Sequence, residues 1–600
     1  MPKKQIKEQK IKISPTKGRP MLNWVGKKPL EYVKGYPAVL MEVFDPLKTG
    51  LKYDIPKFED LEKNWQNSLF YGDNKDVSAT LLEQGFRGKI DLIYIDPPFM
   101  SGADYVRKVE LRGLKETRTD VDDADLLQQT MYFDMWRNDA YLQFMYERLI
   151  LLKELLAETG SIYVHLDWHV GHYVKLLMDE IFGQENFRNE IIWNYVSGGI
   201  SEKFFARKHD TLLFYSKSDD YIFNLQKERD KKYDSTKIHK DEKGEFIWYI
   251  RPKTNPKVPQ GVKSYIDKYV QDVWEIPIVN PQAYERLGYA TQKPEALLER
   301  IIKASSNADN LVLDCFIGSG TTARVAQKLG RRWIGCDINK GAIQTTSREL
   351  QKIILEQIKK KETKYPSFAT YKVNNYDLQL LRTEAIELAV QHIGIQRTKT
   401  DSFFDGTLGK NLVKIIDFNH PFTLLDFQLI QDELKKRSDE DRNITVVCLG
   451  KELAVDPAIE EWNKKHPVNK IEVIELKTNK KYGNFLIHKP DEVKVKIERK
   501  GDKAIVEIKD FISPTIIERL NINNTLFKVK IPDFRAMIDY VLIDTNYDGK
   551  TFHIVCSDVP EKKNDLIKGK YELEISKKKA MIAIKIVDML GEEVLITKEI

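Results

Sequence analysis

The sequence predicts an α/β fold built on an open, largely parallel sheet, and three stretches support this prediction. An apolar run in residues 91–99 stops abruptly at two prolines. A second apolar run, in residues 310–322, leads through a glycine turn into the start of a helix. A strand–helix–strand pattern spans residues 68–99. Strands that alternate with helices in this way are typical of parallel sheets with helices on their faces.

Residues 91–95 are expected to form a buried strand, and the loop after it carries groups suited to chemistry. Pro97 and Pro98 fix φ and donate no N–H, so the strand ends there. The carboxylate of Asp96, the carbonyl of Pro97 and the ring of Phe99 then lie at the carboxyl end of a strand, where open α/β sheets bind ligands. A carboxylate and a carbonyl can accept both hydrogens of an exocyclic amino group while a ring stacks on the base. Taken alone, Asp-Pro-Pro is also an ordinary turn.

The strand before this loop is expected at residues 68–71, followed by Gly72-Asp73-Asn74 and a helix at 76–84. Such a β-α-β unit predicts that the strands at 68–71 and 91–95 are parallel neighbours. Asp73 and Asp96 would then lie on the same edge of one sheet.

Length and composition set the broad class. With 600 residues and 31% charged residues, the chain is expected to hold several domains of a cytoplasmic protein. The net charge of +6 permits an acidic partner such as DNA without establishing one. The four isolated cysteines fit a reducing compartment, and no stretch reaches the length of a membrane span. The lysine-rich start of a basic extension (1–60) is expected to be a solvated terminus, with a DNA-backbone arm as the alternative.

Between the two motifs lie further elements. Residues 101–129 are polar and poorly periodic, which predicts a mobile flap beside Asp96. Helices are expected at 139–156 and 174–182, with a strand at 162–167 between them. His165, His169 and His172 lack a metal-binding spacing, so no metal is expected.

Residues 189–290 break the α/β alternation. Strands are expected at 190–195 and 211–215, and the loops interleave basic and aromatic residues, among them Lys203, Arg207 and Lys208. Cations suit phosphates and rings suit bases, so nucleic-acid contact is one interpretation. An ordinary insertion with solvated charges is the other, and composition alone leaves the two about even.

The second motif predicts a cofactor site. Gly318 and Gly320 allow a tight turn close to a ligand, and a helix at 321–329 would point its N–H groups there. Asp337 ends the next strand, where an acid typically binds ribose hydroxyls. Together these features indicate an adenosine-type cofactor. Ala323 replaces the last glycine of a dehydrogenase fingerprint, and no phosphate-binding G-x-x-x-x-G-K-[ST] sequence is present, so both of those classes are disfavoured.

Three motifs in order carry a specific resemblance: Asp-Pro-Pro-Phe at 96–99, Thr-Gln-Lys-Pro at 291–294, and Asp-x-Phe-x-Gly-x-Gly at 314–320. Over roughly residues 65–349 the chain resembles the β-class amino-methyltransferases of DNA. It is most similar to the modification subunits of type III restriction systems and related orphan enzymes. The resemblance implies a Rossmann-like methyltransferase sheet, S-adenosylmethionine as cofactor, and double-stranded DNA as partner. It leaves open a homodimer and a restriction endonuclease subunit as further partners.

The resemblance also implies roles for single residues. It places the catalytic loop at Asp96, Pro97, Pro98 and Phe99. It assigns the cofactor to Asp73, Lys293, Pro294, Asp314, Phe316, Gly318, Gly320, Thr321 and Asp337. DNA contact is expected from Lys203, Arg207 and Lys208, and no metal takes part.

The implied reaction is methyl transfer to the N6 amino group of adenine in a defined DNA sequence, within a restriction–modification or phage-defence system. N4 of cytosine is the alternative target, and a catalytically idle DNA-binding scaffold of the same fold is the alternative from another class. An RNA or protein target is a third possibility that the residues alone do not separate.

The implied domain order is a catalytic half (61–188), a target-recognition region (189–290) and a cofactor-binding half (291–350). A charged linker (351–372), a small α/β module (373–480) and a β-rich module (481–600) are expected to follow. The short alternating strands of the last module predict a sandwich-like arrangement that serves interaction or DNA clamping.

Overall fold

The fold is described from a computed structural model of the 600-residue chain. The structure describes all residues except the following: 1–9, 16–20, 25, 52, 54–56, 64, 100–103, 110, 113–126, 134–137, 196–201, 230–237, 243, 250–261, 281–284, 288, 290, 375–385, 387–389, 391–392, 398–400, 402, 417–420, 438, 453, 477–490, 518–530, 532, 561–564 and 576–578. The chain forms two compact units. The first comprises 1–374, 493–511 and 523–600, and the second comprises 375–492 and 512–522.

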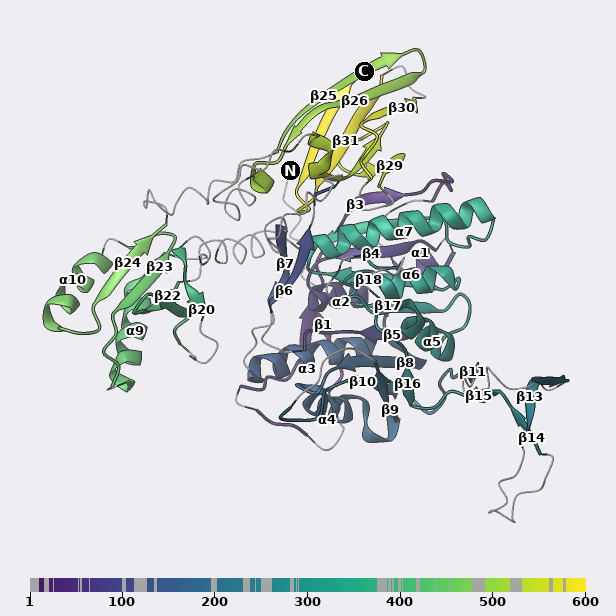
Figure 1. Cartoon of the computed structure of the whole chain (residues 1–600), viewed down its shortest axis with the longest axis horizontal. Coiled ribbons are helices and arrows are strands. Elements are labelled where there is room, and N and C mark those ends of the chain that lie inside the picture. Colours follow the sequence, from purple (N-terminus) through teal and green to yellow (C-terminus); the bar gives the residue numbers. More distant parts are fainter. Residues whose placement is uncertain are drawn as a thin grey trace. The chain divides into compact units, whose positions relative to one another are not determined.

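A large mixed sheet is the framework of the first unit (Figure 1). In the order in which they pair, its described strands are β16 (Val273–Glu275), β9 (Phe187–Asn194), β10 (His209–Ser216), β8 (Leu156–Leu166), β5 (Ile90–Ile95), β17 (Leu311–Asp314), β18 (Arg332–Asp337), β4 (Asn67–Tyr71), β19 (Phe368–Val373), β3 (Ala38–Phe44) and β28 (Phe552–His553). The strands from β8 to β19 are all parallel to one another. This is the α/β sheet that the sequence predicts.

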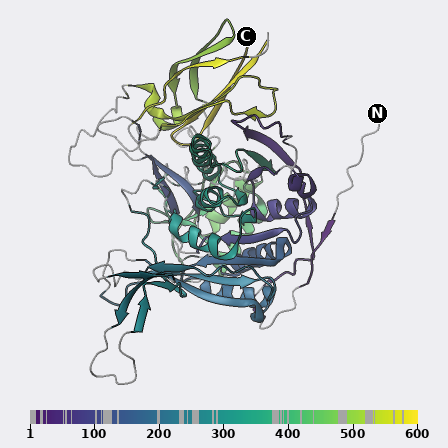
Figure 2. The same ribbon diagram turned by 90° about the vertical axis from the view of Figure 1, so that its right-hand side faces the viewer.

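Helices cover both faces of the parallel strands. They are α1 (Phe58–Lys63), α2 (Asn74–Glu83), α3 (Asn138–Leu155), α4 (Gly171–Phe182), α5 (Glu295–Ser305), α6 (Thr321–Lys328) and α7 (Lys340–Lys360). In β5, Ile93 and Ile95 join the core cluster built with α2, α3 and α4. Leu92 and Tyr94 alternate with them and are equally buried, so β5 is covered on both sides. Figure 2 shows the sheet between its helices from the side.

The prediction that the strands at 68–71 and 91–95 are neighbours is wrong. β4 and β5 are parallel, but β18 and β17 lie between them. These two strands come more than 200 positions later in the sequence and enter the middle of the sheet. A local β-α-β pattern reports direction and handedness, but it does not report a later insertion. Asp73 and Asp96 still follow strand ends on the same edge.

Two further predictions need correction. The sequence predicts no regular structure at 101–129, but this segment contains β6 (Asp104–Val109), which pairs with β7 (Leu127–Phe133). The linker predicted at 351–372 is also wrong. α7 continues to Lys360, and β19 then pairs with β4 inside the central sheet. Lysine, glutamate and glutamine are good helix formers, so a charged run on a solvated helix face imitates a linker.

Residues 189–290 do not form a body of their own. β9, β10 and β16 extend the central sheet beyond β8. The intervening segments hold two small sheets, one of β11 (Lys227–Arg229) with β15 (Asp267–Tyr269), and one of β12 (His239–Asp241), β13 (Gly244–Tyr249) and β14 (Val262–Tyr265). Towards the amino terminus, β1 (Lys10–Lys12) pairs with β2 (Tyr32–Lys34), and a short 3-10 turn, η1 (Gln184–Asn186), follows α4.

The β-rich end of the chain belongs to the first unit. It forms two sheets, one of β25 (Glu492–Lys500), β26 (Lys503–Ile512) and β30 (Lys570–Glu574), and one of β29 (Cys556–Asp558), β27 (Ile538–Asp544), β31 (Met581–Asp588) and β32 (Glu593–Glu599). β28 pairs with β3, and Arg348 of α7 binds Asp539 at 2.8 Å. These contacts join the β-rich segment to the body built on the central sheet.

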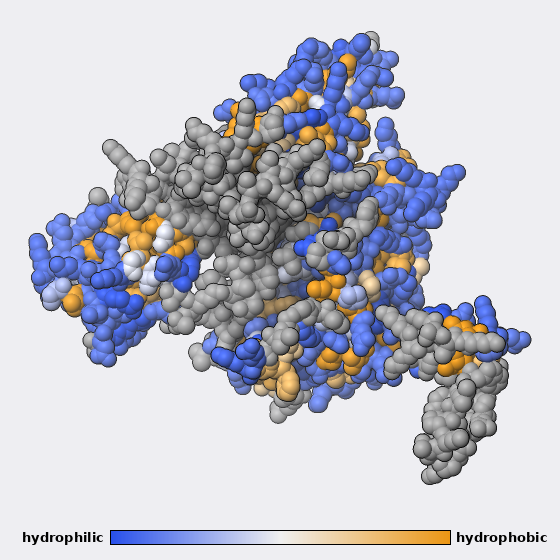
Figure 3. All heavy atoms as spheres, viewed as in Figure 1, coloured by the Kyte–Doolittle hydropathy of each residue, from blue (hydrophilic) through white to orange (hydrophobic). Residues whose placement is uncertain are grey.

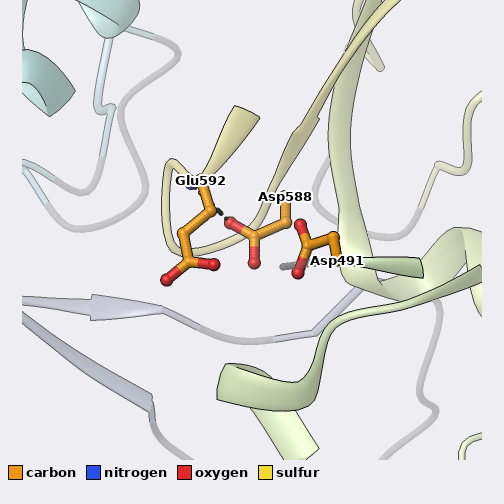
Figure 4. Close-up of side chains that lie close together, drawn as sticks. All are labelled: Asp491, Asp588 and Glu592. Atoms are coloured by element: carbon orange, nitrogen blue, oxygen red, sulfur yellow. Dashed lines mark hydrogen bonds between the residues drawn. The ribbon is translucent and has the colours of Figure 1, made fainter. Parts of the chain in front are cut away.

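The turn between β31 and β32 is closed by Asp588, whose carboxylate accepts the backbone N–H groups of Leu590 and Glu592 at 2.8 Å. Figure 4 shows the side chains of Asp588 and Glu592 at this turn. The third side chain drawn there, Asp491, belongs to the second unit.

The second unit is a small α/β body. Its sheet pairs β20 (Gln396–Arg397), β21 (Gly406–Leu408), β22 (Asn411–Ile415), β23 (Ile444–Cys448) and β24 (Ile471–Glu475) in that order. α9 (Leu424–Lys436) and α10 (Val455–Lys465) connect the parallel strands. Thr423 and Asp426 start α9 with a capping box.

In the space-filling view, most of the coloured surface is hydrophilic, with smaller apolar areas among it (Figure 3). Among the described helices, none combines the length and apolar character needed to cross a lipid bilayer.

Candidate active site

The candidate site lies where the order of the sheet reverses. From β17 the chain passes through α6 to β18 on one side, and from β5 it passes through α3 to β8 on the other. Since β5 and β17 are parallel neighbours, their carboxyl ends lie next to each other, with the helices leaving in opposite directions. Ligands of open α/β sheets bind in the crevice at such a switch point. The Asp-Pro-Pro-Phe loop follows β5, and the glycine turn follows β17.

Asp96 is held by a lysine from the other half of the site. The Lys293 ammonium donates to Oδ2 of Asp96 at 2.6 Å, and the two side chains are 11% and 17% exposed. The same ammonium lies 5.1 Å from the centre of the Phe99 ring. Oδ1 of Asp96 is buried and has no hydrogen-bond partner among the described residues. One carboxylate oxygen is therefore anchored, while the other is available to a donor.

Lys293 and Pro294 are predicted from the sequence to lie beside the cofactor. In the structure the Lys293 ammonium binds the carboxylate of Asp96. Pro294 is the N-cap residue of α5, so its role here is to start a helix. Thr321, the first residue of α6, donates its hydroxyl to the Lys293 carbonyl at 3.2 Å. The glycine turn and the Asp96 loop are thus linked through one residue.

The glycine turn has the backbone that only glycine adopts easily. Gly318 has φ +50° and Gly320 has φ +83°. A Cβ at Gly320 would lie 2.6 Å from the hydroxyl of Thr346, so the turn packs closely on α7. The three described atoms nearest to a Cβ at Gly318 all belong to the ring of Tyr289, the nearest at 3.6 Å, which is ordinary van der Waals contact. Gly318 thus has room beside it, as expected of a backbone that a ligand approaches.

Two carboxylates hold the glycine turn through hydrogen bonds to its backbone. Asp337 accepts the N–H of Gly318 at 2.9 Å and that of Asn339 at 2.8 Å. Asp314 accepts the Thr322 hydroxyl at 2.5 Å and the N–H of Phe316 at 2.9 Å. Burial raises the pKa of Asp337 to about 6 and that of Asp314 to about 7. Desolvation disfavours the charged carboxylate, and the hydrogen bonds offset only part of this effect.

The raised pKa of Asp314 leads to a prediction about stability. The unfolded-state pKa is close to 3.8 and the folded-state pKa is about 7, so between these values the folded chain keeps a proton that the unfolded chain releases. Protonation of Asp314 therefore stabilises the folded chain fully below pH 4, and this stabilisation is lost as the pH rises to 7. Each unit of difference between the two pKa values corresponds to about 1.4 kcal/mol in the free energy of unfolding. Asp314→Asn keeps an acceptor for Phe316 and removes the titration.

We therefore expect the Tm of Asp314→Asn, measured relative to the parent protein by calorimetry, to rise between pH 4 and pH 7. Asp219→Asn is a matched control, because its side chain is 90% exposed. The rise for Asp314→Asn should exceed any change seen with that control. A flat difference for Asp314→Asn would show that this carboxylate is already charged in the folded chain near pH 4.

Asp73 binds an arginine of α3. Nη2 of Arg148 donates to Oδ2 of Asp73 at 2.8 Å and to Oδ1 at 3.0 Å. Oδ1 also accepts the N–H of Lys75 and so caps α2. Asn74 donates to the carbonyl of Cys315 at 3.2 Å. Phe316 packs edge-on against Phe144, with ring centres 6.2 Å apart. The Asp73 region therefore supports the glycine turn from β4 and α3.

A buried hydrogen-bond network around His165 was not predicted from the sequence. His165 is buried on β8, with Nε2 3.1 Å from Oδ2 of Asp210 and Nδ1 2.9 Å from the hydroxyl of Tyr94. In a neutral ring, Nε2 donates to the carboxylate and Nδ1 accepts from Tyr94. Burial raises the pKa of Asp210, but the hydrogen bond from His165 and the charge of Lys293 outweigh it, and the pKa falls below its ordinary value.

This network reaches the Asp-Pro-Pro-Phe loop. The imidazole of His165 lies 6.0 Å from the ring of Phe99 and 5.4 Å from that of Trp193. The hydroxyl of Tyr195 donates to Asp210 at 3.2 Å. A pattern of strand ends predicts polar groups at this edge, but the pairing of Asp210 with His165 depends on β10 lying antiparallel to β8.

The three predicted DNA-contacting residues lie on the segment that leads into β10. Lys203 and Arg207 are exposed and Lys208 is half-buried. The guanidinium of Arg207 stacks on Trp168, 3.6 Å from the ring centre. The carbonyl of Lys208 accepts the N–H of Tyr195 at 3.0 Å. All three belong to the carboxyl edge of β8, the same edge as Asp96.

The chain has a Rossmann-like α/β fold, with its candidate ligand site at the switch point of the sheet. A family model described as DNA methylase matches residues 90–348. The type II methyltransferase M.EcaI of Enterobacter cloacae is 31% identical over 332 residues, which cover 47% of this chain and 69% of that protein. The StyLTI Mod subunit, a type III restriction-modification enzyme of Salmonella typhimurium, is 27% identical over 47% of this chain and 54% of its own length. The crystal structure of the M1.HpyAVI–SAM complex aligns at 19% identity and a TM-score of 0.29, over 47% of this chain and 98% of that one.

The chain therefore belongs to the N6/N4 family of DNA methylases and is a DNA methyltransferase. The match ends within α7, so the rest of the chain lies outside the family model.

Proposed function

We propose that the protein transfers a methyl group from S-adenosylmethionine to the N6 amino group of adenine in a defined sequence of double-stranded DNA. One observation carries the proposal: the two oxygens of Asp96 have different surroundings. Oδ2 is fixed by Lys293, whereas Oδ1 is buried without a described partner. A buried carboxylate oxygen without a donor is costly, and the N–H of an incoming amine satisfies it.

The chemistry of the target explains why such an acceptor is needed. The lone pair of an aromatic amine is delocalised into the ring, which makes the nitrogen a weak nucleophile. Asp96 and the Pro97 carbonyl accept its two N–H groups and direct the lone pair away from the ring. Phe99 stacks on the base, and Lys293 keeps the carboxylate in place during the reaction. Holding the amine at near-attack distance then supplies much of the rate enhancement.

The residues present fit the proposed methyl donor. Gly318 offers an open backbone position beside a turn that glycine alone adopts easily. Asp337 has further lone pairs for ribose hydroxyls, and Gly320 and Thr321 start α6 beside this position. Phe316 provides an aromatic face at the same turn. When bound, S-adenosylmethionine supplies an electrophilic methyl group on a sulfonium.

The target base is unreachable inside a duplex, so it must leave the stack. The extruded base is proposed to bind beside Phe99, at the edge of the sheet that carries the His165–Asp210 network. Tyr195 borders this place with a hydroxyl that donates to Asp210, and the buried ring of Trp193 packs against His165. N4 of cytosine is the second candidate target, because the same acceptors serve either amine.

The proposal is tested by transfer of a tritiated methyl group from S-adenosylmethionine to unmethylated plasmid DNA, total RNA or a protein mixture. We expect incorporation into duplex DNA alone. Incorporation into RNA or protein would overturn the substrate class, and no incorporation would favour an idle scaffold. A restriction–modification setting with an endonuclease partner is proposed from the similarity to the Mod subunit.

Neutralising the basic segment before β10 should weaken DNA binding. In the triple variant Lys203→Gln, Arg207→Gln, Lys208→Gln, we expect the plot of log K against log salt to become shallower by about 0.9 for each phosphate that the protein no longer neutralises. Fluorescence anisotropy with a labelled duplex at several salt concentrations measures this. Binding of S-adenosylmethionine should not change, because these residues lie away from the glycine turn.

A matched triple variant controls for net charge. Lys435, Lys436 and Lys465 lie on exposed faces of α9 and α10 in the second unit. Their replacement by glutamine should leave the salt dependence unchanged. If this control variant loses affinity and the first does not, DNA binding resides in the second unit.

A further inference from the structure

The loop between β9 and β10 presents an aromatic side chain entirely to solvent. Within its described part, residues 202–208, Phe205 is 100% exposed and Phe204 is 58% exposed. Nearby, Trp168 after β8 is 46% exposed. Single exposed apolar residues are common, but two exposed rings on this loop with a third close by call for a partner with apolar faces.

The loop is anchored at its base, so Phe205 is displayed from a fixed position. The guanidinium of Arg207 lies 3.6 Å from the centre of the Trp168 ring and 5.0 Å from that of Phe204. The carbonyl of Lys208 accepts the N–H of Tyr195, which ties the two strands together where the loop begins. Phe204 and Arg207 are thus held by contacts with each other, and Phe205, which lies between them in the sequence, is fully exposed.

The sheet register brings this loop to the catalytic edge. Val164 of β8 pairs with Ile95 of β5, and Leu166 pairs with Thr211 of β10. The end of β8 is therefore beside Asp96 on one side and beside the start of β10 on the other. The chain of contacts Tyr195–Asp210–His165 continues this edge towards the ring of Phe99.

The chemistry of the loop selects one kind of partner. Lys203, Arg207 and Lys208 supply positive charge, and Phe204 and Phe205 supply flat apolar surface. Duplex DNA combines negative phosphates with flat, stacked base pairs, and apolar side chains enter between base steps in other DNA-binding proteins. A protein partner with an acidic rim would match the charge but would not explain the position beside the proposed base pocket.

We propose that Phe205 is a wedge that enters the DNA base stack and occupies the space left by the target base when it turns into the pocket at Phe99. This inference rests on the proposed function and adds to it the residue that stabilises the opened duplex. Arg207 and Trp168 are positioning residues that hold the wedge loop.

The wedge predicts a dependence on base pairing. We compare two duplexes that carry the sequence methylated by the wild-type protein. In one the target base is paired, and in the other it faces an abasic site. Phe205→Ala should lower kcat/KM about tenfold or more on the paired target, and about twofold or less on the unpaired one, because an unpaired base is cheaper to extrude. Phe205→Trp should keep most of the activity on both, since it retains a flat ring.

Phe223→Ala is the matched control, because Phe223 is 48% exposed and follows β10, at the opposite end of that strand from the wedge loop. It should behave like the wild type on both duplexes. With 2-aminopurine as the target base, Phe205→Ala should reduce the rise in fluorescence that reports unstacking.

Three outcomes overturn the proposal. An equal loss on the paired and unpaired duplexes would show that Phe205 contributes to general DNA affinity. No loss on either would place the ring in a contact with another molecule, such as a protein. If the wild-type protein methylates no DNA at all, the proposed function itself is wrong, and the wedge with it.

Discussion

Replacing Asp96 by alanine is expected to lower methyl transfer to DNA by about two to three orders of magnitude, the scale seen when one preorganised polar group is removed from an active site. The variant loses Oδ1, the proposed acceptor for the amine, together with the oxygen that binds Lys293. Binding of S-adenosylmethionine should stay near the wild-type value, because the glycine turn is supported by Asp337 and Asp314. Tritium transfer measures the first quantity and calorimetry the second.

Two further variants make the Asp96 result interpretable. Asp96→Ala leaves the ammonium of Lys293 unpaired and largely buried, which can destabilise the fold. The double variant Asp96→Ala, Lys293→Met removes that charge, and it should fold while remaining inactive. Asp96→Asn keeps one acceptor oxygen, which the Lys293 ammonium and the amine would both need, so its activity should also fall well below that of the wild type. Full activity in Asp96→Ala would show that the amine binds elsewhere, and loss of S-adenosylmethionine binding would place Asp96 in the cofactor pocket.

Replacing Gly318 by valine is expected to weaken S-adenosylmethionine binding at least about tenfold, since a penalty of only ~1.4 kcal/mol gives that factor. A β-branched residue at φ +50° is strained, and its side chain occupies the open space beside the turn. Calorimetric titration of the purified variant measures the change.

Gly330→Val separates strain from occlusion in this experiment. Gly330 follows α6, has φ +68° and has no atom within 4 Å of the place a Cβ would take. Its replacement introduces similar backbone strain at the end of α6 away from the glycine turn, so S-adenosylmethionine should bind normally. If both variants lose binding equally, the loss comes from destabilisation of α6, and the cofactor need not touch Gly318.

Local sequence signals predicted the strands and turns that carry the site. The two prolines after β5 end a strand because they lack N–H groups, and the glycines after β17 have positive φ, so residues 91–99 and 310–322 fold as expected. Both effects act within a few residues, so they can be predicted without knowledge of the fold.

Contacts between distant residues were beyond the reach of the same signals. Lys293 and Asp96 are 197 positions apart, and their pairing follows from the insertion of β17 beside β5. The prediction that β4 and β5 are neighbours failed for the same reason. The buried pair His165 and Asp210 also needs the antiparallel register of β10 on β8. Hydrophobic periodicity reports which face of a strand is buried and is silent about the order of strands.

The charge pattern gave a wrong prediction just after the end of the family match, where a linker was expected. Residues 351–372 contain many charges, but α7 buries Leu350, Ile353 and Ile354 on one side and exposes lysines on the other. β19 then completes the central sheet next to β4. A solvated helix face and a linker have similar composition, and only the apolar stripe distinguishes them.

The most direct test of the account identifies the modified nucleoside. DNA without prior methylation is incubated with the protein and S-adenosylmethionine, digested to nucleosides and examined by mass spectrometry, with Asp96→Ala in parallel. We expect N6-methyladenine with the wild-type protein and none above background with the variant. N4-methylcytosine in its place would contradict the adenine assignment. Methylation that is equal with Asp96→Ala, or absent with the folded wild-type protein, would contradict the central claim that Asp96 presents a base amine for methyl transfer.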